Sequence, residues 1–339
     1  MWKRVIAVVA ILLLATTGCS PRLTQLFKKP PAVSNLPPSA LFSDGPAIHT
    51  RTLNLIDSAQ KSLYVEQVLF DDSELMNHVI KKFQAGVEVK ILLDQWQSPN
   101  KTTLDSLKSQ GISVQFYPAR KGQFHRVKFL VVDQTKALVY GPSWTSSSWQ
   151  ANHDLAVELS GRSAGWTADI FAQDWKFTTT LSLDVSKSSA LPDDYIVLAR
   201  NANLKQQISE RIMASNQSIW VETAEVSDED TIQSLIDAAG KGRDVRLLLS
   251  QKMGKDKPDM IARLKTGGVK IRYATLPNNE AFNLHIGLFD DKTFILTSSD
   301  WSYYTFVINH EFSITVPSPT ATAKLKSVFE ADWATGSAA

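Results

Sequence analysis

Two short segments of the sequence carry charged or nucleophilic side chains at alternate positions. Arg126 and Lys128 are two residues apart, and so are Asn283 and His285. Alternate side chains of an extended strand point to the same face, so both members of each pair could contact one ligand. A guanidinium and an ammonium hold anions, and an imidazole can transfer a proton or attack an electrophile. These residue types predict a site for an oxyanion.

The two segments occupy matching places in a repeated sequence. Residues 63–66 (LYVE) match residues 219–222 (IWVE), and the match continues beyond the segments that carry Lys128 and His285. A single inserted residue separates the earlier part of the alignment from the later part. Such a long correspondence indicates a tandem duplication, with one half over 44–185 and the other over 192–335.

Each half alternates segments typical of strands with segments typical of helices. In the first half we expect helices over 73–85, 103–110 and 165–178, and strands over 63–70, 87–93, 112–117, 127–132, 137–141 and 154–159. Strands that alternate with helices form sheets covered by helices on both faces. The predicted fold is therefore α/β, with two duplicated halves, each a mixed sheet flanked by helices, packed about a pseudo-two-fold axis.

The order of the motifs in each half resembles the phospholipase D superfamily. Its halves each carry His-x-Lys-x4-Asp, then Gly-Ser-x-Asn, then an Asn-x-Glu-like element. The matching segments here are 126–133, 141–144 and 152–154 in the first half, and 283–290, 298–301 and 309–311 in the second. Over residues 45–335 the resemblance implies the fold of that family, a phospholipid or another phosphodiester as ligand, and no cofactor.

The resemblance also implies roles for individual residues. In the family one histidine attacks phosphorus, the histidine of the other half protonates the leaving oxygen, and the lysines neutralise charge. Arg126 and Asn283 stand at the two histidine positions here, and His285 stands at the second lysine position. The remaining matches are Ser143 and Asp300 as phosphate contacts, Asp133 and Asp290 as motif aspartates, and Asn152, Asp154, Asn309 and Glu311 in support.

The substituted histidine positions separate three hypotheses. We predict a phosphate-binding cleft between the halves in which catalysis is weakened or lost. The alternative is an active phosphodiesterase or phosphatidyltransferase in which a β-bulge turns His125 toward Lys128 and His285, with Asp133 and Asp290 completing the catalytic set. Without a bulge, His125 faces away from Lys128 and is an ordinary residue at the rim. A nuclease-like protein is the weaker third alternative.

His153 and His310 occupy matching positions and could suggest a metal site. Duplication alone explains their symmetry, and no cysteine ligand accompanies them. The sequence therefore predicts no metal site. The acidic runs Asp71-Asp72 and Asp228-Glu229-Asp230 lie at the starts of helical segments, where carboxylates act as helix caps.

The N-terminus resembles a bacterial lipoprotein signal. Lys3 and Arg4 precede an apolar run over 5–15, and small residues lead to Cys19, the only cysteine. We expect 1–18 to be a signal peptide, Cys19 to be lipidated, and 19–43 to be a Pro-rich tether. An ordinary cleaved signal, or an anchor with an incidental cysteine, is the alternative. The expected location is the bacterial cell envelope, on the outer membrane and facing the periplasm.

The charge balance argues against a nucleic-acid partner. The chain has 36 basic and 34 acidic residues, and loss of Lys3 and Arg4 with the signal makes the two numbers equal. Proteins that hold nucleic acid through bulk charge are strongly basic. The expected partners are a phospholipid or another phosphodiester, and the membrane through Cys19.

Overall fold

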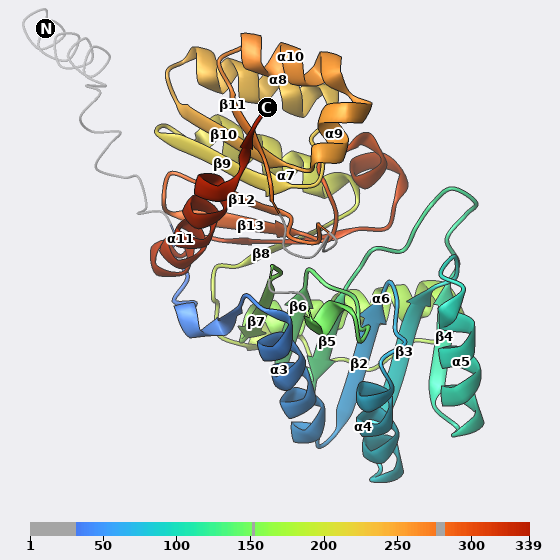
Figure 1. Ribbon diagram of the computed structural model, residues 1–339. Coiled ribbons are helices and arrows are strands. Elements are labelled where there is room, and N and C mark those ends of the chain that lie inside the picture. Colours follow the sequence, from blue (N-terminus) through green and yellow to red (C-terminus); the bar gives the residue numbers. More distant parts are fainter. Residues whose placement is uncertain (1–31, 151–152, 276–281) are drawn as a thin grey trace, which may run out of the picture. The chain divides into compact units, whose positions relative to one another are not determined.

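The computed structural model describes residues 32–150, 153–275 and 282–339 (Figure 1). The expected signal peptide, Cys19 and the first part of the tether lie outside the described residues, and so does Asn152. Residues 34–339 contain two β-sheets, one in each half of the sequence.

The sheet of the first half has seven strands in the order β1-β7-β6-β5-β2-β3-β4. Strands β2, β3 and β4 are parallel, and the other neighbours are antiparallel. The strands are β1 (Leu41–Phe42), β2 (Ser62–Gln67), β3 (Glu88–Asp94), β4 (Ser113–Tyr117), β5 (Phe129–Val132), β6 (Lys136–Tyr140) and β7 (Ala156–Ser160).

The sheet of the second half has eight strands in the order β15-β11-β10-β9-β12-β13-β14-β8. Its strands are β8 (Val197–Arg200), β9 (Ser218–Thr223), β10 (Asp244–Leu249), β11 (Lys270–Tyr273), β12 (Ile286–Phe289), β13 (Thr293–Thr297), β14 (Phe312–Val316) and β15 (Ser337–Ala338). The central order β14-β13-β12-β9-β10-β11 repeats β7-β6-β5-β2-β3-β4 of the first sheet. The predicted duplicated α/β fold with two mixed sheets is therefore confirmed.

Helices cover the sheets on both faces (Figure 1). The first half contains α3 (Gly45–Ser58), α4 (Ser73–Gln84), α5 (Pro99–Ser109) and α6 (Arg162–Thr179). The second half contains α7 (Ala202–Ala214), α8 (Glu229–Gly240), α9 (Gln251–Asp256), α10 (Pro258–Thr266) and α11 (Pro319–Thr335). Short 3-10 turns lie at η1 (Pro38–Ala40), η2 (Ser148–Gln150) and η3 (Ser188–Ala190), and a π-helical turn, η5, spans Tyr304–Ile308.

The expected capping carboxylates begin two matching helices. The side chain of Asp72 accepts a hydrogen bond from the backbone N–H of Leu75 at the start of α4. Asp228 does the same for Thr231 at the start of α8. A carboxylate at this position satisfies a free N–H group and interacts favourably with the helix dipole. Helix capping therefore accounts for Asp72 and Asp228 in the two acidic runs.

Alternating side chains of the central strands build three apolar cores. In β2, Leu63 and Val65 pack in an outer core with the helices α3, α4 and α5, whereas Tyr64 faces the opposite way. Trp220 of β9 faces the same central core as Tyr64. That core also holds residues of α6 and α11, and Phe129 of the first half meets Phe312 of the second at 5.4 Å between ring centroids. The two halves therefore share buried apolar surface.

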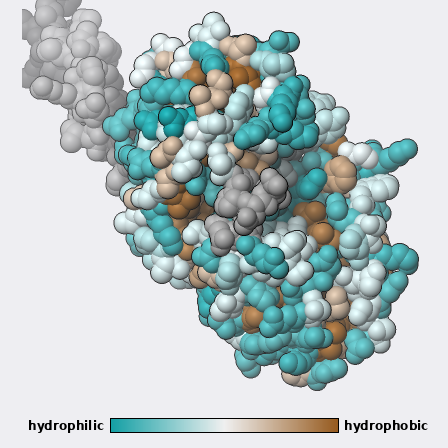
Figure 2. Space-filling view, viewed as in Figure 1, coloured by the Kyte–Doolittle hydropathy of each residue, from teal (hydrophilic) through white to brown (hydrophobic). Residues whose placement is uncertain are grey.

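The outer surface is largely polar on the face shown in Figure 2, where hydrophobic residues occur in small separate groups. Within the described part of the chain, no helix is both long enough and apolar enough to cross a membrane.

Candidate functional site

A cavity of about 570 Å³ lies between the two halves. The first half contributes Arg126, Lys128 and Ser143 to its lining, and the second half contributes Asn283, His285, Asp300 and Asn309. The structure therefore brings together most of the residues that the sequence placed in one site. Both halves are required to form it.

The backbone positions Lys128 and His285 in the same way in each half. Lys128 comes directly before β5, and its carbonyl accepts from Tyr140 N–H. His285 comes directly before β12, and its carbonyl accepts from Thr297 N–H. The strand predicted over 127–132 begins two residues later than expected. The preceding chain leaves the sheet because the backbone N–H of Arg126 donates to the backbone carbonyl oxygen of His310 in the other half, at 2.7 Å.

Lys128 is the buried cation of the cavity. Its side chain donates to the carbonyl oxygen of Gly141. Burial lowers the pKa of Lys128 to about 8, although the nearby Asp154 carboxylate opposes that shift. Lys128 is therefore mostly charged at neutral pH but close to losing its proton. A negatively charged ligand would favour the protonated form.

Gly141 allows this close packing. A Cβ atom at this position would lie 2.4 Å from the carboxylate oxygen Oδ1 of Asp154 and 3.2 Å from the backbone oxygen of Asn283. Any larger residue would push apart the Asp154 side chain and the segment that leads to His285.

His285 is a neutral imidazole in this environment. Burial, followed by the positive charges of Lys128 and Arg126, lowers the pKa of His285 to about 3. Its Nδ1 atom lies 2.8 Å from the hydroxyl of Thr223. A hydrogen bond donated by Nδ1 to that hydroxyl would leave Nε2 with its lone pair.

Two carboxylates lie behind the cavity, one from each half. Burial raises the pKa of Asp154 to about 7 and the pKa of Glu311 to about 7. The side chain of Glu311 accepts hydrogen bonds from Ser298 and, at 3.0 Å, from Asn309. Asp300 faces the cavity and accepts from the Thr305 hydroxyl at 3.0 Å, and burial raises its pKa as well.

His125 does not line this cavity. It precedes β5, its backbone N–H donates to Asp94 at 2.7 Å, and its ring lies against Glu66 and His310 and not beside Lys128 and His285 as the catalytic alternative required. The description of His125 as a rim residue is also wrong, since its exposed fraction is 0%. Its ring stacks between Tyr117 and His310, at 4.7 and 5.3 Å between centroids.

Asp133 and Asp290 also lie outside the cavity. Asp133 accepts from the backbone N–H groups of residues 60–62, and Asp290 accepts from those of residues 216–218. Both residues have φ near +50°, a left-handed conformation that Asp adopts more readily than most residues. The catalytic role expected for these aspartates is therefore corrected to a structural one. Asp133 holds the turn before β2 against the hairpin after β5, and Asp290 holds the turn before β9 against the hairpin after β12.

The matching histidines pair with carboxylates of the opposite half. Nε2 of His153 lies 2.6 Å from Glu222, which raises the pKa of His153 to about 9 although burial opposes this. Nε2 of His310 lies 2.9 Å from Asp174. Neither Glu222 nor Asp174 was predicted as a site residue. Glu222 and its counterpart Glu66 are charged residues inside otherwise apolar repeat segments, and Asp174-Trp175 recurs in the second half as Asp332-Trp333, so the repeat offered a signal for each.

Comparison with known proteins decides the family. Residues 52–175 and 208–333 each match the family described as cardiolipin synthase, PLD-like domain. The chain belongs to this phospholipase D-like family. The two matches contain β2–β7 and β9–β14, the strands whose order repeats between the two sheets.

One curated relative is cardiolipin synthase 2 of Bacillus cereus, which is 25% identical over 248 residues. The match covers 63% of this chain and 48% of the relative, so the chain spans about half the length of that protein.

Two solved structures share the fold. Phosphatidylserine synthase of Haemophilus influenzae superposes with a TM-score of 0.69 at 12% identity, covering 91% of this chain and 90% of that one. Polyphosphate kinase of Porphyromonas gingivalis superposes with a TM-score of 0.61 at 12% identity, covering 90% of this chain and 50% of that one. At these identities the likeness concerns the fold alone.

Proposed function

We propose that this protein binds the phosphate group of a phospholipid or another phosphodiester in the cavity between its halves, and that turnover is weak or lost. The observation that carries the proposal is the cavity lining. Arg126 and Lys128 of the first half and Asn283 of the second line the cavity, so hydrogen-bond donors from both halves are available to one phosphate.

The loss of turnover follows from the number of imidazoles in the cavity. A covalent mechanism with a second histidine as proton donor needs two of them. His285 is the only histidine among the described residues that line the cavity. His125 lies behind the cavity wall, and Arg126 and Asn283 cannot replace a nucleophile.

The relatives support a phospholipid as the ligand. A curated relative is a cardiolipin synthase and a structural neighbour is a phosphatidylserine synthase, and phospholipids carry the phosphodiester that the cavity residues suit. A lipid-anchored location would place the cavity close to such ligands. We include in the proposal a lipid anchor at Cys19 on the periplasmic face of the outer membrane.

The test compares binding with turnover on the same preparations. We expect the full chain to bind a soluble phosphodiester in calorimetry and to hydrolyse a chromogenic phosphodiester slowly or not at all. Lys128→Ala should abolish binding while circular dichroism shows an intact fold. His78→Ala, which changes a histidine bonded to Asp57 outside the cavity, is the matched control.

Two results would contradict the proposal. One is the failure of the unmutated protein to bind phosphodiesters. The other is turnover at the rate of an active family member that disappears in His285→Ala and persists in His78→Ala. The second result would establish the active phosphodiesterase and assign the chemistry to His285.

A further inference from the structure

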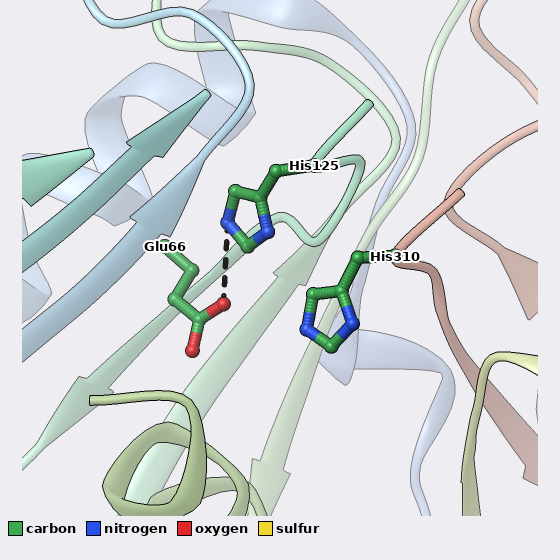
Figure 3. A group of neighbouring side chains, drawn as sticks. All are labelled: Glu66, His125 and His310. Carbon is green, nitrogen blue, oxygen red and sulfur yellow. Dashed lines mark ion pairs between the residues drawn. The ribbon is translucent and has the colours of Figure 1, made fainter. Parts of the chain in front are cut away.

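A second cluster of functional side chains lies behind the cavity wall. Glu66, His125 and His310 present one donor atom each within 4.8 Å of one another (Figure 3). Glu66 comes from β2, His125 from the segment before β5, and His310 from the segment before β14, so both halves contribute. All three side chains are buried, with exposed fractions of 0%, 0% and 3%.

The polar atoms of this cluster are poorly satisfied. Among the described residues, no hydrogen-bond partner is found for either carboxylate oxygen of Glu66, either ring nitrogen of His125 or Nδ1 of His310. Nε2 of His125 lies 3.3 Å from Glu66 without hydrogen-bond geometry. Buried polar atoms are nearly always bonded, and each one left without a partner is costly. Five such atoms at one place indicate that this cluster binds a ligand.

The charges indicate that this ligand is a cation. A second carboxylate, Asp174, lies 2.9 Å from Nε2 of His310 and 3.0 Å from the guanidinium of Arg200. Arg200 is thus paired with Asp174, whereas Glu66 is paired with no lysine or arginine among the described residues, and the two imidazoles add no positive charge when neutral. A divalent ion would offset the remaining negative charge and occupy the lone pairs of the imidazoles.

The equivalent place in the other half holds a second group of this kind, His153, Glu222 and Asp332, whose donor atoms also lie within 4.8 Å of one another. There His153 bonds directly to Glu222 at 2.6 Å, and Asp332 lies 3.7 Å from its Nδ1. The repeat places Phe282 where the first half has His125. The added imidazole of His125, and the open carboxylate of Glu66, are therefore specific to the first cluster.

We propose that Glu66, His125 and His310, with Asp174 as the adjoining carboxylate, form a buried structural site for a divalent transition metal, zinc in the first instance. Two imidazoles and carboxylate oxygens are donors that zinc accepts, and closed structural sites use four of them. The ligands of a tetrahedral zinc lie about 3.4 Å apart, given its bond lengths. Binding draws the donors closer together than they are in this structure.

Such an ion would join the two halves beside the cavity. Backbone hydrogen bonds already connect the segment of His125 with that of His310. The N–H of His310 donates to the carbonyl oxygen of Phe124 at 2.8 Å, and the N–H of Arg126 donates to the carbonyl oxygen of His310 at 2.7 Å. Arg126 and Asn309, the neighbours of the two histidines, line the cavity. The metal would fix the positions of these two side chains. The proposal does not depend on what the cavity binds.

The test uses the full chain, purified without a histidine tag and stripped of metal with a chelator. After incubation with Zn²⁺ and dialysis, we expect one equivalent of zinc per chain and a higher melting temperature. Co²⁺ in its place should give the visible absorption of a tetrahedral complex. His125→Phe, which copies the other half, should lower the affinity for Zn²⁺ by more than the about 100-fold typical of lost second-shell contacts.

His153→Gln is the matched control, because it changes the second cluster, where the histidine bonds directly to Glu222, and should leave zinc binding at the first cluster intact. The proposal is overturned if the unmutated chain retains no zinc and shows no cobalt absorption. It is also overturned if folded His125→Phe binds zinc as tightly as the unmutated chain, or if the ion is lost only in His153→Gln. Should His125→Phe fail to fold, Glu66→Gln gives the same comparison, and the result on the unmutated chain stands by itself.

Discussion

Raising the pH should weaken phosphodiester binding in a manner set by Lys128. Burial lowers the pKa of this side chain to about 8, so its charge disappears within an accessible range. The ligand used in this experiment should be a phosphodiester, because the single negative charge of a phosphodiester does not change between pH 6 and 9. Any change in affinity then reports on the protein.

The magnitude follows from the protonated fraction of Lys128. With a pKa of about 8, roughly nine-tenths of the side chain is charged at pH 7 and roughly one-tenth at pH 9. If the ligand binds only the charged form, the apparent Kd rises about tenfold over this range, which is about 1.4 kcal/mol. Because Lys128 must be protonated to bind the ligand, the affinity is high below pH 8 and falls as the pH rises above it.

The other buried groups act in the same direction or not at all. Asp154 and Glu311, each with a pKa of about 7, gain negative charge as the pH rises and so repel the ligand. His285, with a pKa of about 3, stays neutral throughout. The affinity should therefore fall steadily from pH 6 to pH 9 without a maximum.

Calorimetric titrations at half-unit intervals, at constant ionic strength, would measure this profile. Lys128→Met should lose binding at every pH, as Lys128→Ala should. Lys101→Met is the matched control, because Lys101 is an exposed lysine that pairs with Asp105 outside the cavity, and this variant should keep the profile of the unmutated protein. An affinity that is constant or rises between pH 7 and 9 in the unmutated protein would refute the assignment of the ligand charge to Lys128.

Two further predictions concern parts of the chain outside the cavity. Asp290→Ala should lower the free energy of unfolding by about 1–3 kcal/mol, because three backbone N–H groups lose a charged acceptor; denaturant titration would measure this, and an unchanged midpoint would show that the turn does not depend on it. Cys19→Ser should release the protein from the membrane fraction or leave it unprocessed, as judged by fractionation and mass of the mature chain. Recovery of an unchanged, membrane-bound mature form would rule out the lipid anchor.

The fold could be predicted from the sequence because the duplication gave two independent copies of each signal. Residues 63–65 and 219–221 are apolar in both copies, each is followed by a glutamate, and they lie in β2 and β9, which are interior strands of their sheets. A chance apolar run would not recur with the same neighbours. The boundaries were less certain, since β5 begins at Phe129 only because the chain before it hydrogen-bonds with the other half. Contacts between distant segments leave no local signal.

The candidate site was predicted in part, and the errors have a common cause. Alternation correctly placed Arg126 with Lys128, and Asn283 with His285, on the faces that line one cavity. The expectations for Asp133 and Asp290 came from their position in a family motif, which carries no information on where a side chain points. Their left-handed backbone conformation directs both carboxylates to the turns before β2 and β9.

The histidines show most clearly what one sequence cannot reveal. The symmetry of His153 and His310 was visible and was attributed to duplication, yet the two copies differ in what surrounds them. Tyr117, His125 and Glu66 surround one histidine, whereas Glu222 bonds directly to the other. The difference arises because the first repeat has His125 where the second has Phe282. In the sequence this is a single substitution next to Arg126. Its importance depends on His310, which the opposite half supplies, so the cluster of Glu66, His125 and His310 can be recognised only in the three-dimensional structure.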